Sequence, residues 1–145
     1  MRRLLVTLVG LTLLLLPGRH SGAADGGQYV LIVNPKLAID RVERGFVRDA
    51  YLGKVASWPG GATVRPLDLG AAAPERRRFG RELLGKSPAQ LRAYWNQRVF
   101  SGNGTPPPSV ESGAAAVTYV LATPGAIAYI PADVGPGGAR VVQLE

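Results

Sequence analysis

Cysteine is absent from this 145-residue chain, and histidine occurs only once, as His20. Without cysteine no disulfide can form, so a folded domain of this sequence depends on its apolar core. Zinc sites, cysteine nucleophiles and Ser–His pairs all need thiolate or imidazole groups, and none lies downstream of residue 20. We therefore expect a protein that is not an enzyme and that carries no metal and no cofactor.

Acidic residues are also scarce, with 10 Asp and Glu against 17 Lys and Arg. The first 24 residues contain a basic start, an apolar run over Leu4–Leu16, a Pro-Gly breaker and a small-residue site. This order is typical of a secretory signal, and the apolar run is shorter than the about 20 residues of a membrane span. We expect residues 1–24 to be a signal peptide, cleaved after Ala23 or Ala24. An uncleaved anchor is the alternative.

Cleavage would leave one domain, residues 25–145, in the periplasm or secreted, and no longer attached to a membrane. It removes Arg2, Arg3 and Arg19 but no acid, which lowers the net charge from +7 to +4. This excess is mild and is not interleaved with aromatic residues, so we expect no nucleic-acid partner.

Four runs of aliphatic and β-branched residues predict strands, at residues 29–33, 63–69, 126–130 and 140–144. The run Tyr29–Val33 is apolar throughout, a pattern typical of a strand in a parallel sheet that is covered on both faces. Pro66 interrupts the second run, so that strand is expected at a sheet edge or at a bulge.

Four helices are predicted by apolar residues at helical spacing, over residues 41–52, 74–84, 87–99 and 110–122. Their expected caps and end are Asp40 with Glu43, Ser87 with Gln90, Ser109, and Gly53 at the end of the first helix. The last helix is expected to bury Val110, Ala114, Val117 and Leu121. This order of elements predicts an α/β fold, with a mixed sheet flanked by about four helices.

Three loops are candidates for a ligand site. The turn Gly70–Pro74 leads into a helix with four arginines, and backbone N–H groups and arginine forks at such a helix start attract anions. A solvated basic helix face is the alternative interpretation. The loop Ser101–Gly104 and the strand end Asn34–Pro35 offer hydrogen-bonding groups, although the same residues also make ordinary turns.

Two acids near the arginine helix, Asp68 and Glu75, suggest a third reading, an acid–base hydrolase. Nothing in the sequence fixes the separation of these two carboxylates, so the hydrolase is the weakest of the readings.

Several stretches, taken in order, resemble the phosphate-type periplasmic solute-binding proteins of ABC transporters, in particular short secreted chains of that kind. The stretches are Val30–Pro35, Phe46–Lys54, Trp58–Gly61, Phe79, Leu84–Ser87, Tyr94–Trp95, Val99–Pro107 and Thr123–Ile130. The resemblance implies a single lobe of a type II periplasmic-binding-protein fold, whereas full members bind their ligand between two lobes. It also implies that a small oxyanion such as phosphate is the ligand.

The resemblance and the arginine loop together give a candidate anion site. We expect it to comprise Arg76 and the turn residues Ala72, Ala73 and Glu75, assisted by Ser101 and Gly102. The family presents hydroxyl side chains at this turn, where this chain has alanines. Partners implied are an ABC permease or another envelope protein, with a homodimer as a further possibility. The alternative function is a structural or regulatory partner in an envelope complex that binds no ligand.

Overall fold

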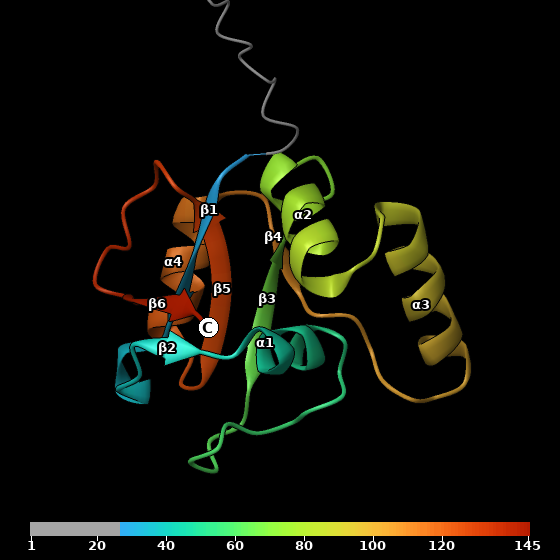
Figure 1. Ribbon diagram of the computed structural model, residues 1–145, viewed down its shortest axis with the longest axis horizontal. Helices are drawn as coiled ribbons and strands as arrows, with labels where there is room; N and C mark the ends of the chain where they lie inside the picture. The colour runs from blue at the N-terminus through green and yellow to red at the C-terminus, as the bar shows by residue number, and fades with distance from the viewer. Residues whose placement is uncertain (1–26) are drawn as a thin grey trace, which may run out of the picture.

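A mixed six-stranded sheet, in the order β2-β6-β1-β5-β3-β4, organises the computed structural model, which describes residues 27–145 (Figure 1). The predicted signal peptide lies outside the described residues. The strands are β1 (Tyr29–Val33), β2 (Arg41–Val42), β3 (Arg65–Leu69), β4 (Ser109–Val110), β5 (Ala126–Pro131) and β6 (Arg140–Leu144). The helices are α1 (Arg44–Tyr51), α2 (Pro74–Phe79), α3 (Pro88–Phe100) and α4 (Gly113–Ala122), with a short 3-10 turn η1 (Pro35–Leu37) and a π-helical turn η2 (Gly80–Leu84).

The predicted mixed sheet with its four helices is confirmed. The parallel pairing that the apolar run of the first strand indicated is wrong. β1 pairs antiparallel with both of its neighbours, β5 and β6. Parallel pairing occurs elsewhere, between β3 and β5, β3 and β4, and β2 and β6. Burial explains the apolar run equally well, because a strand in the middle of a sheet covered on both faces needs no polar side, whatever the direction of its neighbours.

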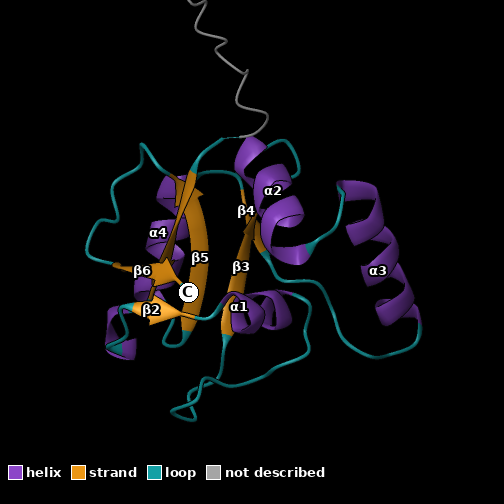
Figure 2. Ribbon diagram, in the orientation of Figure 1, coloured by secondary structure: helices purple, strands orange, loops and turns teal. Residues whose placement is uncertain are grey.

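Helices cover both faces of the central strands (Figure 2). Residues 126–130 of β5 are all 0 % exposed, so neither face of this strand contacts water. On one face α4 packs along β5, and on the other a cluster of aromatic rings joins α1 and α2 to the strand. In that cluster Phe79 stacks on Tyr129 at 4.1 Å between ring centroids, and Tyr51 meets Phe79 edge-on at 4.6 Å.

Pro66 lies in β3, which is one strand away from the sheet edge. The N–H of Arg65 donates to β5, through the carbonyl of Gly125, and the N–H of Asp68 donates to the other side, through the carbonyl of Pro108. β4 pairs only with Asp68 and Leu69, so β3 has no strand on that side at Pro66. The missing N–H of proline therefore costs no ladder hydrogen bond. Strand β3 is at the sheet edge at this residue, because β4 does not extend to it.

The first predicted helix begins later than expected. Residues 41 and 42 form β2, and α1 starts at Arg44 behind Glu43, whose side chain makes no cap hydrogen bond. Asp40 forms an ion pair with Arg140 at 2.8 Å instead of capping a helix. The predicted end is confirmed, because Gly53 takes a left-handed conformation with φ +67° after the helix.

The helix predicted over residues 74–84 is present, its second half wound as η2. The capping box of Ser87 and Gln90 is also present at the start of α3. The last helix, in contrast, starts at Gly113 with Ser112 as its cap, whereas Ser109 belongs to β4. The face that packs on the sheet also differs from the predicted one, and the expected buried positions Ala114 and Leu121 are exposed.

Helix α3 lies beside the sheet rather than on it (Figure 1). Tyr94 donates to the carbonyl of Leu52 at 2.6 Å and Arg98 to the carbonyl of Gly53 at 3.2 Å, which fixes α3 against the end of α1. Leu91 and Trp95 of α3 are buried, and a cavity remains between α3 and the α2–η2 helix.

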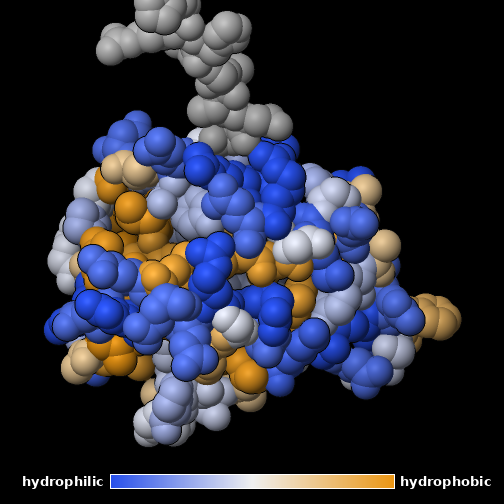
Figure 3. Space-filling model, viewed as in Figure 1, coloured by the Kyte–Doolittle hydropathy of each residue, from blue (hydrophilic) through white to orange (hydrophobic). Residues whose placement is uncertain are grey.

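The face of the molecule in Figure 3 is mainly hydrophilic, with apolar surface in patches between charged side chains. Within residues 27–145, no helix has the length and apolar character needed to cross a bilayer.

Candidate anion site

A buried carboxylate marks the end of β3. Asp68 is 8 % exposed and accepts hydrogen bonds from the backbone N–H of Leu69, at 2.9 Å, and from the Tyr129 hydroxyl. The parallel register of β3 and β5, in which Leu67 lies opposite Ala128, brings Asp68 beside Tyr129. A buried phenol needs a hydrogen-bond partner, and the carboxylate supplies it.

The protonation states of this pair follow from their surroundings. Burial raises the pKa of the Asp68 carboxyl, although the Tyr129 hydrogen bond and the charge of Arg76 act in the opposite direction. Burial and the adjacent carboxylate together raise the pKa of the Tyr129 hydroxyl well above its ordinary value. Tyr129 is therefore the proton donor of the pair, and Asp68 is the acceptor.

Arg76 connects this buried pair to the surface. Its Nη2 lies 3.0 Å from Oδ2 of Asp68, and its side chain is about one third exposed. A guanidinium has five N–H donors in a rigid fork, so the bond to Asp68 orients the group and leaves other donors for a ligand. The hydrogen bond from Tyr129 to Asp68 and the ion pair between Asp68 and Arg76 thus hold the Arg76 guanidinium in a defined position.

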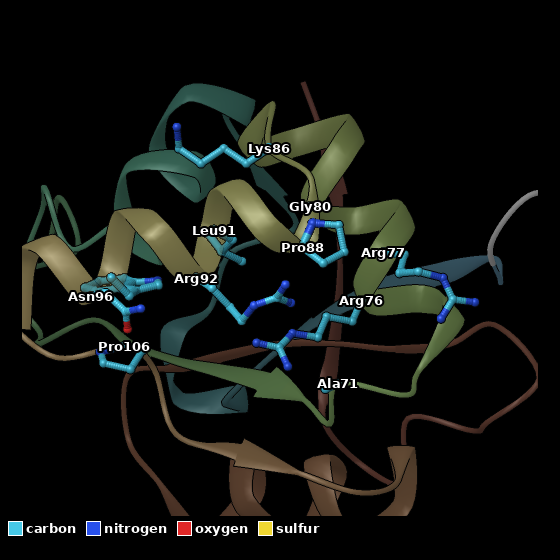
Figure 4. Close-up of a pocket in the computed structure, with 11 residues that line it drawn as sticks. Ala71, Arg76, Arg77, Gly80, Lys86, Pro88, Leu91, Arg92, Asn96 and Pro106 are labelled. Carbon is cyan, nitrogen blue, oxygen red and sulfur yellow. The ribbon is translucent and has the colours of Figure 1, made fainter.

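The donors of Arg76 face a cavity of about 270 Å³ between α3 and the α2–η2 helix. Its lining residues are Ala71, Arg76, Arg77, Gly80, Lys86, Pro88, Leu91, Arg92, Trp95, Asn96 and Pro106. Figure 4 shows the guanidinium groups of Arg76 and Arg92 turned toward one another across this space, while that of Arg77 points away.

Arg92 has no partner for its charge within the described part of the chain. Among residues 27–145 its guanidinium takes part in no hydrogen bond and no ion pair. The Lys86 ammonium lies 5.3 Å from the Tyr94 ring centre, and Figure 4 shows it outside the space between the arginines. Two guanidinium groups thus face one another, and in residues 27–145 one carboxylate, that of Asp68, is paired with them. An oxyanion between them would remove the repulsion and accept hydrogen bonds from both.

The turn before α2 contributes less than the sequence indicates. Ala72 is exposed, and Ala73 caps the helix without a side-chain hydrogen bond. The N–H of Ala73 already donates to Gly70 at 3.0 Å, and Pro74 has no N–H. Glu75 lies with its carboxylate against Gly27. Of the expected residues near this turn, the structure therefore places Arg76 at the cavity.

Ser101 and Gly102 lie at the C-terminal end of α3 and do not line the cavity. The Ser101 hydroxyl donates to the carbonyl of Gln97 at 2.9 Å, and the N–H of Gly102 donates to Val99 at 3.1 Å. Both groups close the last turn of the helix, and the structure does not bring them together with Arg76.

Asn34 has a structural role as well. It is buried, its side-chain amide donates to the carbonyl of Val120 at 2.9 Å, and its side-chain oxygen accepts from the N–H of Lys36 at 3.0 Å. The carbonyl of Val120 lies in the last turn of α4, where it otherwise accepts only a long hydrogen bond from the N–H of Thr123, at 3.4 Å, among the described residues.

The fold does not bring together the two carboxylates that the acid–base hydrolase would use. Asp68 faces Tyr129 and Arg76, whereas the Glu75 carboxylate lies against Gly27, and the two acids do not contact one another. In the described part of the chain, no three His, Cys, Asp or Glu side chains are grouped closely enough to hold a metal ion.

Two residues of the site, Tyr129 and Arg92, are not among those that the sequence indicates. Tyr129 carries a weak signal, because a tyrosine inside an otherwise aliphatic strand needs a buried acceptor. Arg92 carries none, since it is one of several polar residues on a helix and only the docking of α3 turns it toward Arg76.

Neither a protein-family model nor a curated protein sequence matches this chain. Solved structures do. One is an ABC-type phosphate transport receptor from Vibrio cholerae, with a TM-score of 0.63 and 16% identity, over 82% of this chain and 46% of that chain. A second is a phosphate ABC transporter substrate-binding protein with bound phosphate from Clostridium perfringens (0.61, 18%, over 82% and 45%). A third is PstS from Borrelia burgdorferi (0.64, 12%, over 83% and 48%).

This chain spans a little under half the length of the structures it matches. Identities of 12 to 18% carry the fold but not the roles of single residues. The protein has the α/β fold of a single lobe of a periplasmic binding protein, with a six-stranded mixed sheet and four helices among its described residues.

Proposed function

We propose that this protein is an exported, non-enzymatic binding module that holds a small oxyanion such as phosphate between Arg76 and Arg92. One observation carries the proposal: the two guanidinium groups converge on one cavity, and among the described residues Asp68 alone forms an ion pair with either of them. Planar guanidinium forks match the geometry of phosphate and carboxylate oxygens, and two of them can bind one anion from opposite sides.

The buried pair has a defined part in this proposal. Asp68, fixed by Tyr129 and the backbone of Leu69, positions Arg76 before any ligand arrives. Binding then orders little beyond the Arg92 side chain, which lowers the entropic cost of association. Arg92 sits on α3, so the anion would also connect this helix to the α2–η2 helix.

The names of the structural neighbours support the choice of ligand and suggest a partner. They are described as phosphate receptors and substrate-binding proteins of ABC transporters. We propose on this basis that an ABC permease or another envelope protein is the macromolecular partner.

Calorimetric titration with phosphate and sulfate at low ionic strength tests the proposal. We expect heat of binding at millimolar or lower concentration. Arg92→Ala should weaken binding at least about tenfold, because a charge-assisted hydrogen bond contributes about 1.5–3 kcal/mol. Arg65→Ala removes the same charge from an exposed position that does not line the cavity, and should change affinity less than about twofold.

Two results would refute this function. One is the absence of heat with either anion at millimolar concentration. The other is equal weakening by Arg92→Ala and Arg65→Ala, which would mean that net charge rather than the cavity attracts the anion.

A further inference from the structure

The arginine cavity is larger than an inorganic oxyanion requires. Its volume is about 270 Å³. A water molecule occupies about 30 Å³ in the liquid, so the cavity has the volume of roughly nine water molecules. One phosphate ion, with five non-hydrogen atoms, would leave part of this space for something else.

The chemistry of the walls indicates what that remainder is. Apart from Asn96 and the basic side chains, the lining is apolar: Ala71, Gly80, Pro88, Leu91, Trp95 and Pro106. Leu91 and Trp95 are each 8 % exposed, so they form a firm floor held in the core, and the two prolines have rigid rings. Apolar walls gain nothing from a hydrated ion but gain from an apolar group that displaces water.

Helix α3 contributes to both the basic and the apolar part of the wall. Arg76 projects from α2, whereas Arg92, Leu91 and Trp95 come from α3, and Pro106 comes from the chain that returns toward β4. A ligand with a charged head between the two arginines could therefore place an apolar body along α3 toward the Pro106 segment.

We propose that the ligand is a small soluble organic oxyanion, a phosphorylated or phosphonate compound of about ten non-hydrogen atoms, rather than inorganic phosphate. The inference rests on the proposed anion function of Arg76 and Arg92 and adds the apolar body. The head group sits between the guanidinium groups, and the body lies against Leu91 and Pro106.

A ligand series tests the inference without altering the protein. Inorganic phosphate, methylphosphonate and phenylphosphonate share a tetrahedral phosphorus head group and differ in apolar volume. Titrated at one pH and ionic strength, phenylphosphonate should bind at least about tenfold more tightly than methylphosphonate, since each buried CH₂-sized group contributes about fourfold. Methylphosphonate should in turn bind no more weakly than phosphate.

A pair of proline variants locates the effect. Pro106→Ser removes an apolar ring from the wall, whereas Pro108→Ser makes the same change in the same segment at a residue that does not line the cavity. Pro108 accepts the N–H of Asp68 through its carbonyl, which serine retains. We expect Pro106→Ser to reduce the preference for phenylphosphonate at least about threefold, and Pro108→Ser to leave it unchanged.

The outcomes separate the two proposals. If phosphate binds as tightly as phenylphosphonate or more tightly, the organic ligand is refuted and the anion function stands. If none of the three compounds binds, both fail. A phenyl preference that Pro106→Ser and Pro108→Ser affect equally would place the apolar contact outside this cavity and overturn the inference.

Discussion

Replacing Tyr129 with phenylalanine isolates the hydrogen bond that fixes the buried carboxylate of the candidate site. The substitution keeps the ring that stacks on Phe79 and removes only the hydroxyl that donates to Asp68. The carboxylate retains the N–H of Leu69 and the Arg76 guanidinium. A hydrogen bond to a charged group contributes about 1.5–3 kcal/mol, and we expect Tyr129→Phe to lower the free energy of unfolding by that amount at neutral pH.

The loss should depend on pH, with a sign that follows from the pKa of Asp68. Burial raises this pKa above its ordinary value of 3.8, so Asp68 favours folding most below 3.8, and this contribution falls as pH rises through the folded-state pKa. The Tyr129 bond holds the folded-state pKa down, and its removal raises that pKa further. The cost of Tyr129→Phe therefore grows as pH rises and shrinks on acidification toward about 0.5–1.5 kcal/mol, the contribution of a neutral hydrogen bond.

Tyr51→Phe is the matched control. Tyr51 is equally buried in the same aromatic cluster, but its hydroxyl donates to the backbone carbonyls of Leu67, at 2.8 Å, and Ile127, at 3.2 Å. These acceptors do not titrate, so the cost of Tyr51→Phe should stay constant over the same pH range. Urea unfolding of wild type and both variants, from pH 8 down to the lowest pH at which all three fold, measures both profiles.

A cost of Tyr129→Phe that does not change with pH, or that follows the Tyr51→Phe profile, would refute the reasoning. Either result would mean that Asp68 is not the charged acceptor of the Tyr129 hydroxyl.

Two further predictions concern backbone geometry and helix capping, both read from thermal or urea unfolding. Gly125→Ala should cost more than about 2 kcal/mol, because φ is +80° and a Cβ would meet the carbonyl of Thr63. Gly60→Ala, with nothing within 4 Å, should stay within about 0.5 kcal/mol, and equal costs would contradict the close approach at Gly125. Ser112→Ala should cost about 1 kcal/mol as the loss of a helix cap, whereas Ser109→Ala should stay within about 0.5 kcal/mol. The reverse order would restore Ser109 as the cap.

The strands and most helix ends could be predicted because their signals are local. Continuous apolar runs mark β1 and β5, and the Ser87–Gln90 capping box is a short-range pattern that needs no tertiary context. β2 and β4 have two residues each, too few for any alternation to be visible, and both formed part of predicted helices. Strand pairing, a long-range interaction, decides these short segments.

Helix α4 shows a different limit. Its sequence is apolar almost all round, so the apolar spacing does not fix which positions face the sheet. The apolar spacing predicts a buried side chain at position 121, yet Leu121 is 41 % exposed. The buried residues are Gly113, Ala116, Val117 and Val120, and the packing of α4 on β5 decides this stripe.

The residues of the candidate site also include one that local sequence predicts and others that depend on long-range packing. Arg76 could be predicted from its place in the first turns of a helix, a local feature. Arg92 and Tyr129 depend on how α3 docks and on the register of β3 against β5, which join residues distant in sequence. Ser101 and Gly102 match the family pattern in sequence, but the loop that contains them closes its own helix.

The most direct test of the account is the position of a bound heavy oxyanion. Tungstate has the tetrahedral shape of phosphate and scatters anomalously, so crystals soaked in it report where such an anion binds. We expect the strongest anomalous peak between the guanidinium groups of Arg76 and Arg92, and its loss from Arg92→Ala crystals. Peaks on other basic side chains, with the space between these two arginines empty, would contradict it.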